Sequence, residues 1–183
     1  KWSLLEAIPT NRVKHFNRYH ILKCWVFVYI CYMEINLDIR KEILDYSLKI
    51  EDFVNNLILA FLQIDKDKSK VFSNKSSSFS FKNKIDLLMD VEAINKEEFL
   101  KFELLMVIRN QFMHNVNCNS YTECFNILDN SIKNRLLKDY VYIYEYPDEL
   151  NYKNAYGELF YECLRIVHEK IGQKLNLIED KKN

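Results

Sequence analysis

The sequence contains little glycine and little proline, with only two of each among its 183 residues. Because all-β folds rely on many turns that need these residues, their scarcity favours helices. A Gly-rich phosphate-binding loop is excluded as well, since Gly157 and Gly172 are the only glycines. Hydrophobic residues make up 49% of the chain and charged residues 28%, which supports a packed core and argues against extensive disorder. The composition therefore predicts a mainly α-helical globular protein.

An excess of charge of one sign is also missing, because 26 Lys and Arg balance 26 Asp and Glu. Domains dedicated to nucleic-acid binding are usually basic, so direct DNA binding is not expected. A local basic patch is still compatible with a net charge of zero. The longest apolar run, residues 24–33, is about half of the roughly 20 residues that a membrane-spanning helix needs. We therefore expect no membrane segment.

The five cysteines are an odd number in a chain that is too large to need disulfide bonds for its stability. We expect them to be reduced and mostly buried. Nothing at the N-terminus reads as a signal peptide. Together these features predict an intracellular protein of the cytoplasm.

Three parts can be distinguished along the chain. Residues 1–36 form an N-terminal extension with a basic first half, and its β-branched and aromatic run at 25–33 suits either a buried strand or a buried helix. Residues 37–178 form a helical domain, and residues 179–183 form a frayed tail. Residues 140–146 alternate like a short strand, so a small β-hairpin with the run at 25–33 is an open alternative.

Apolar residues recur every three or four positions from Ile39 to Phe61, which predicts a helix with Asp38 as its N-cap. Asn95, followed by two glutamates, predicts the start of another helix, because its side chain can cap and the helix dipole favours acids there. The expected helices cover residues 39–62, 81–90, 96–114, 122–138 and 152–175.

A Lys- and Ser-rich stretch, residues 63–83, separates the first two of these helices and is expected to be a surface loop. Its lysines and a neighbouring one are candidate contacts for RNA phosphates, and a solvated linker is the other interpretation. These candidates are Lys66, Lys68, Lys70, Lys75, Lys82 and Lys84.

The helix expected at residues 96–114 is apolar on nearly every face, which is typical of a helix that lies centrally or in an interface. Its last turns become polar at Arg109, Asn110 and His114. Asn110 and His114 are four residues apart and share a face, and Arg109 is long enough to turn its guanidinium toward that face. We therefore expect the three side chains to converge on one small anion.

This set of side chains suits a phosphodiester. A guanidinium offers a permanent charge and forked donors for phosphate oxygens, and a histidine can exchange a proton near neutral pH. RNA carries its own nucleophile, the 2′-hydroxyl, so its cleavage needs no metal or other cofactor and leaves a cyclic phosphate. The alternative is a buried hydrogen-bond network, or capping of helix carbonyls by Arg109 and His114. A zinc site is not expected, because His114, Cys118 and Cys124 include no Cys-x2-Cys pair and lack a fourth ligand.

Residues 107–115, Val-Ile-Arg-Asn-Gln-Phe-Met-His-Asn, resemble the Arg-Asn-x-Phe-x-His signature of the HEPN superfamily. With residues 78–88 and the acidic turn that follows them, the pattern is most similar to the mannitol-operon repressor (MltR) branch. The likeness covers about residues 40–170 and leaves out residues 1–36. Met113 departs from it, because a small residue often stands at this position.

The resemblance implies an up-and-down helical bundle that forms a homodimer through the helices bearing the motif. In active relatives two copies of the Arg/His pair build one ribonuclease site. It implies that Arg109 binds phosphate, His114 positions or protonates, Asn110 supports them, and Glu51 or Asp52 orients Arg109. The expected function is a metal-independent endoribonuclease, as in a toxin or defence effector with an antitoxin partner. The alternative is a non-catalytic regulatory or protein-binding dimer.

Overall fold

The computed structural model describes residues 35–65, 67, 69, 79–140 and 147–180. Within these residues it contains six α-helices and no strand, so the prediction of a mainly α-helical bundle is confirmed. The helices are α2 (Leu37–Leu62), α3 (Phe81–Asp90), α4 (Lys96–His114), α5 (Tyr121–Ile127), α6 (Asn130–Tyr140) and α7 (Asp148–Asp180). No helix of this described part is long and apolar enough to cross a membrane.

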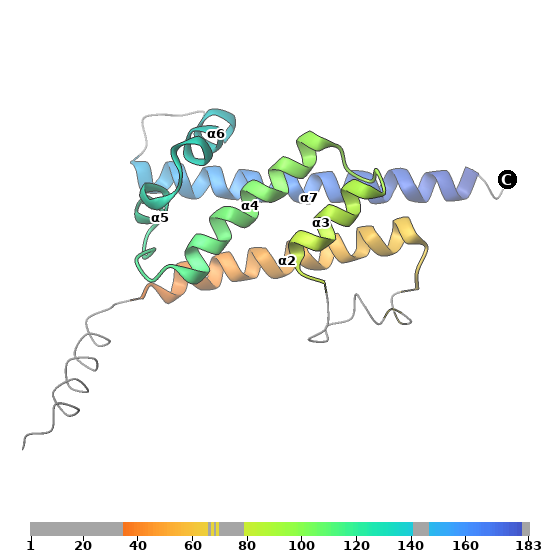
Figure 1. The fold of residues 1–183 in the computed structure, drawn as a ribbon, viewed down its shortest axis with the longest axis horizontal. Helices are drawn as coiled ribbons and strands as arrows, with labels where there is room; N and C mark the ends of the chain where they lie inside the picture. The colour runs from red at the N-terminus through yellow and green to blue at the C-terminus, as the bar shows by residue number, and fades with distance from the viewer. Residues whose placement is uncertain (1–34, 66, 68, 70–78, 141–146, 181–183) are drawn as a thin grey trace, which may run out of the picture. The chain divides into compact units, whose positions relative to one another are not determined.

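The two longest helices, α2 and α7, lie along each other and run in the same direction (Figure 1). α4 runs the opposite way and crosses them obliquely. Its first half is joined to α7 by an ion pair between Lys101 and Glu162, with 2.9 Å between Nζ and Oε1. Its C-terminal end reaches α2, where the Arg40 guanidinium donates to the Asn115 carbonyl at 2.8 Å. α4 therefore bridges the two long helices.

α4 is covered by several neighbours at once, because α2, α3, α5 and α7 all contact it. One of the contacts with α5 is an edge-to-face pair of rings, Phe112 and Tyr121, with 5.1 Å between centroids. The prediction of a centrally placed helix at residues 96–114 is thus confirmed. Its buried side chains are Phe99, Phe102, Leu104, Leu105, Ile108 and Phe112.

The bounds of α3 and α4 agree with the predicted ranges. Asn95 caps α4 as expected, and it does so in a capping box with Glu98. The Asn95 side chain accepts from the Glu98 backbone N–H at 2.9 Å, and the Glu98 carboxylate accepts from the Asn95 N–H at 2.7 Å. Two of the four N–H groups that a helix leaves open at its start are thereby paired.

The N-cap predicted for the first long helix is wrong. α2 begins at Leu37, and the Asn36 side chain caps it by accepting from the Ile39 N–H at 3.2 Å. Asp38 lies inside the first turn instead, where the helix dipole favours a carboxylate. Asn36 is also held from a distance, since its backbone N–H donates to the Asn119 side chain at 3.2 Å.

The single helix predicted at residues 122–138 is also wrong, because two helices stand in its place. Leu128 has extended backbone angles and ends α5, and the Asp129 carboxylate accepts from the Ser131 N–H at 2.7 Å as α6 begins. α6 ends at Tyr140, which corrects the assignment of that residue to a strand. Residues 141–146 and the run at 25–33 lie outside the described residues. α7 extends beyond the predicted 152–175 at both ends.

We expect Asn95→Ala to lower the free energy of unfolding by about 1 kcal/mol, because the Glu98 N–H loses its acceptor. Denaturation by urea, followed by circular dichroism, measures the change. Asn95→Asp is the matched control, since it keeps an oxygen in the same place and should stay close to the original protein. An equal loss in both variants would contradict a capping role.

Candidate functional site

Arg109 and Asn110 lie on the wall of a cavity of about 420 Å³ between α2, α4 and the start of α3. We call it the Arg109 cavity. Three segments far apart in the sequence meet there, from residues 47–51, 79–82 and 106–110. Its lining residues are Ser47, Glu51, Phe79, Ser80, Phe81, Lys82, Met106, Arg109 and Asn110.

The Arg109 guanidinium turns toward Asn110, and its Nη1 donates to Oδ1 of that residue at 3.0 Å. Its Nε is buried and has no hydrogen-bond partner in the described part of the chain. None of the ion pairs among the described residues includes Arg109. Arg109 therefore offers the cavity a positive charge that no carboxylate among the described residues neutralises.

Glu51 lines the same cavity, but its carboxylate pairs with Lys84 and not with Arg109. The distance between Lys84 Nζ and Glu51 Oε1 is 2.5 Å. The Lys84 side chain is only 2% exposed, whereas that of Glu51 is 38% exposed. This burial corrects the expectation that Lys84 contacts RNA, because an ammonium group covered by protein cannot reach a phosphate.

The burial of Lys84 could have been predicted from its position in the helix, although a lysine is usually exposed. Lys84 stands on the inward stripe of α3 with Phe81, Ile85 and Leu88, which are all buried. Their spacing of three and four residues places Lys84 on the apolar face of the helix. Ser47 was missed as well. It lines the cavity one turn before Glu51, while its hydroxyl donates to the Ile43 carbonyl at 2.7 Å.

The other side chains predicted to belong to the site do not gather at the Arg109 cavity. Asp52 lies on the exposed side of α2 and does not line the Arg109 cavity. Lys82 stands at the edge of the cavity with a 55% exposed side chain, and its Nζ pairs with Asp86 at 2.8 Å and with Glu103 at 2.9 Å. Lys75 and the candidate lysines between residues 66 and 70 lie outside the described residues.

His114 is the last residue of α4; it is exposed and does not line the Arg109 cavity. It shares the solvent-facing side of α4 with Val107 and Asn110, at spacings of three and four residues. No hydrogen bond between described residues joins His114 to Arg109. Within one chain, His114 therefore lies further along α4 than the Arg109 guanidinium, on the face toward which Arg109 turns.

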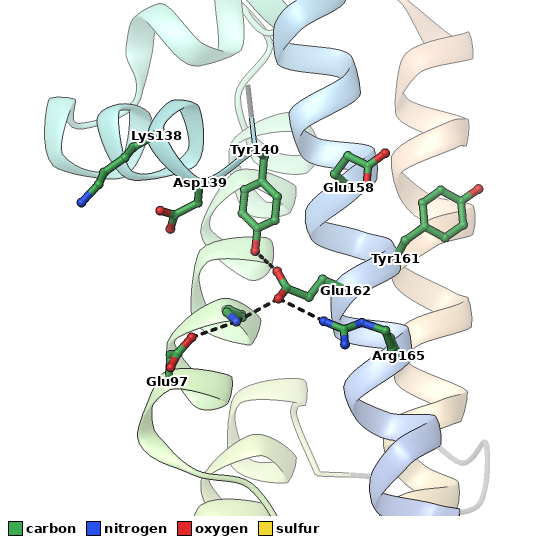
Figure 2. A pocket seen from close by; sticks show the side chains of 9 residues that line it. Glu97, Lys138, Asp139, Tyr140, Glu158, Tyr161, Glu162 and Arg165 are labelled. Atoms are coloured by element: carbon green, nitrogen blue, oxygen red, sulfur yellow. Dashed lines mark hydrogen bonds and ion pairs between the residues drawn. The ribbon is translucent and has the colours of Figure 1, made fainter. Parts of the chain in front are cut away.

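A larger cavity of about 710 Å³ is lined by residues of α4, α6 and α7 (Figure 2). Glu162 of α7 stands at its centre. Tyr140 donates its hydroxyl to Oε2, and Oε1 lies 2.9 Å from Lys101 Nζ and 3.5 Å from an Arg165 nitrogen. Glu97 holds Lys101 from the other side at 3.1 Å. We call these five residues the Glu162 cluster.

In the Glu162 cluster the positive and negative side chains are paired with one another. Burial by itself would raise the pKa of Glu162, but the Tyr140 hydroxyl and the Lys101 and Arg165 charges outweigh it and hold that pKa below its usual range. Burial and the same hydrogen bond raise the pKa of Tyr140, which stays protonated. Both oxygens of the Glu162 carboxylate already have partners. The cluster therefore holds α4, α6 and α7 together.

Cys118, Cys124 and Cys163 are free and buried, and burial raises the pKa of each thiol. Among the described residues, no group of three or more His, Cys, Asp and Glu is arranged to hold a metal ion. Comparison of the chain with known protein families, with curated proteins and with solved structures finds no match.

We expect Glu162→Gln to lower the free energy of unfolding by about 2 kcal/mol near neutral pH, because charged hydrogen bonds to Tyr140 and Lys101 are weakened. The pKa of Glu162 is lowered on folding. Its stabilisation is therefore complete above the pKa of the unfolded chain and is lost as the pH falls through the folded pKa. Urea denaturation at about pH 7 and about pH 3 should show the penalty shrinking in acid.

Glu158→Gln is the matched control, because Glu158 is an exposed residue of the same helix at the rim of the same cavity. It should change the free energy of unfolding little at either pH. A penalty for Glu162→Gln that does not depend on pH would show that the charge of Glu162 is not its source.

Proposed function

We propose that this chain is a HEPN-type, metal-independent endoribonuclease in which Arg109 and Asn110 bind the scissile phosphate and His114 transfers a proton. The observation that supports this most is the state of Arg109. It lines an open cavity and has no carboxylate partner among the described residues. A guanidinium in this position has forked donors available to an anion that enters the cavity. A phosphodiester, whose oxygens accept forked N–H donors, is such an anion.

The reaction would begin with attack of the ribose 2′-hydroxyl on phosphorus. The bond between O2′ and phosphorus forms, and the bond from phosphorus to the 5′-oxygen of the next nucleotide breaks. The 2′-hydroxyl gives up its proton to a base, and the leaving 5′-oxygen receives one, so the products are a 2′,3′-cyclic phosphate and a 5′-hydroxyl. Arg109 would stabilise charge on the non-bridging oxygens, and the His114 imidazole would serve as acid or base.

The separation of Arg109 and His114 supports a site that a second copy of the chain completes. Five residues on a helix correspond to a rise of about 7.5 Å, and no hydrogen bond joins the two described side chains. Val107, 36% exposed, extends the same face with apolar surface. If two α4 helices pair through this face about a two-fold axis, His114 of one copy approaches Arg109 of the other. A homodimer is therefore part of the proposal.

RNA is the proposed substrate. A toxin or defence effector in the cytoplasm, with an antitoxin as protein partner, is the proposed setting. The second candidate is a regulatory or protein-binding dimer without catalysis. It is favoured by one observation, the position of His114 outside the Arg109 cavity. In that case the cavity would hold a phosphate or carboxylate of the partner.

Incubation of a mixed RNA pool in EDTA tests the ribonuclease directly. We expect the original chain to leave cyclic-phosphate ends, and Arg109→Ala and His114→Ala each to lose activity by about 100-fold or more. His168→Ala is the matched control, because His168 is an exposed histidine of α7 in edge contact with the Phe53 ring. It should cleave like the original. No cleavage by a folded dimer would favour the binding module.

Mixing the two inactive variants tests the shared site. A dimer of one Arg109→Ala chain and one His114→Ala chain still has an intact Arg109 facing an intact His114 of the other copy. We therefore expect the mixture, after unfolding and refolding together, to cleave RNA faster than either variant alone. A mixture no more active than its parents, although mixed dimers are present, would place both residues of the working pair in one chain.

A further inference from the structure

Lys84 is a charged side chain that the fold buries almost completely, with 1% of the residue exposed. Among the described residues its only ion-pair partner is Glu51, reached from α3 across to α2. Removing an ammonium group from water costs several kcal/mol, which a single ion pair repays only in part. An apolar pair would join the two helices equally well. Stability therefore does not explain why a lysine stands here.

The neighbourhood of this ion pair suggests another reason. Glu51 is the only carboxylate among the described residues that line the Arg109 cavity. Its charge is taken by Lys84, and Arg109 is left without an ionic partner. The three groups carry two positive charges and one negative charge, so one positive charge is left over, that of Arg109 on the cavity wall. Without Lys84 the carboxylate and the guanidinium would face the same cavity and neutralise each other.

Lys82, two residues earlier in α3, differs from Lys84 in its exposure and in its partners. Its side chain is 55% exposed and its charge is shared between Asp86 and Glu103 on the surface. Lys82 thus adds little positive charge to the cavity wall. The positive character of the wall rests on Arg109, and Arg109 stays available because Lys84 engages Glu51.

We propose that Lys84 is a positioning residue of the phosphate site: by holding Glu51, it leaves Arg109 free to bind the phosphodiester. Lys84 acts through Glu51 and does not touch the RNA. The identity of the anion rests on the proposed ribonuclease function. The relation between Lys84, Glu51 and Arg109 is a property of the folded chain and can be tested without RNA.

The state of Arg109 can be followed by the NMR signal of its Nε–H in the full ¹⁵N-labelled chain, assigned by its absence in Arg109→Ala. In Lys84→Met we expect this signal to shift, because Glu51 is released and pairs with Arg109. Addition of Glu51→Gln should return it toward its original position. If Lys84→Met does not fold, Lys84→Ala replaces it, since alanine also removes the partner of Glu51 and leaves space for water beside the carboxylate. A signal that does not move would overturn the proposal.

Binding of a 2′-O-methyl RNA strand, which lacks the nucleophile and is not cleaved, gives the second readout. We expect Lys84→Met to weaken binding about tenfold, by loss of one charged hydrogen bond to phosphate. The slope of log affinity against log salt should become shallower by about 0.7, the value for one lost contact with a single strand. Glu51→Gln should restore both quantities. In an Arg109→Ala background Lys84→Met should have no further effect, because it acts through Arg109.

Lys170→Met is the matched control for breaking an ion pair elsewhere, because Lys170 pairs with Glu98 at 3.1 Å and both side chains are mostly covered. It should leave RNA affinity unchanged. An equal effect of Lys84→Met with and without Arg109 would overturn the proposal. If the Arg109 signal responds as expected but the original chain neither binds nor cleaves RNA, the ribonuclease proposal fails and the role of Lys84 toward Arg109 stands.

Discussion

The packing of α4 against α2, α3, α5 and α7 is the interaction on which the rest of the bundle depends. Its apolar side chains point in several directions, so no single neighbour can cover them. The two long helices lie along each other, and α4 crosses both, so each of them covers part of its surface. Near its C-terminal end α4 keeps an exposed face that carries Val107, Asn110 and His114, and the neighbouring Arg109 lines the Arg109 cavity.

Two polar clusters among the described residues, the Glu162 cluster and the lining of the Arg109 cavity, use the same residue types with opposite results. In the Glu162 cluster the central carboxylate accepts from a hydroxyl and two cations, and the charges balance within the protein. In the Arg109 cavity the carboxylate of Glu51 pairs with Lys84, and the guanidinium has no carboxylate partner among the described residues. The first arrangement joins helices, whereas the second leaves a positive wall that an anion can complete.

Within one chain, His114 and Arg109 do not meet in one cavity. An exposed histidine at the end of α4 lies outside the cavity that holds Arg109. In the proposed ribonuclease, phosphate binding and proton transfer are therefore separated within a chain, and a symmetric pair of chains would bring them together. In the proposed dimer the same face of α4, which carries the apolar Val107 beside Asn110, would be the contact.

The features that depend on neighbouring residues could be predicted from the sequence alone: the mainly helical fold, the bounds of α3 and α4, and the Asn95 cap. Helical periodicity and capping act within a few residues, so they can be read along the chain. The Asn36 cap and the break after α5 were missed, because several alternative polar residues could serve there. Only the tertiary structure decided that Glu51 faces Lys84, since 33 residues separate them in sequence and the packing of α2 on α3 brings them together.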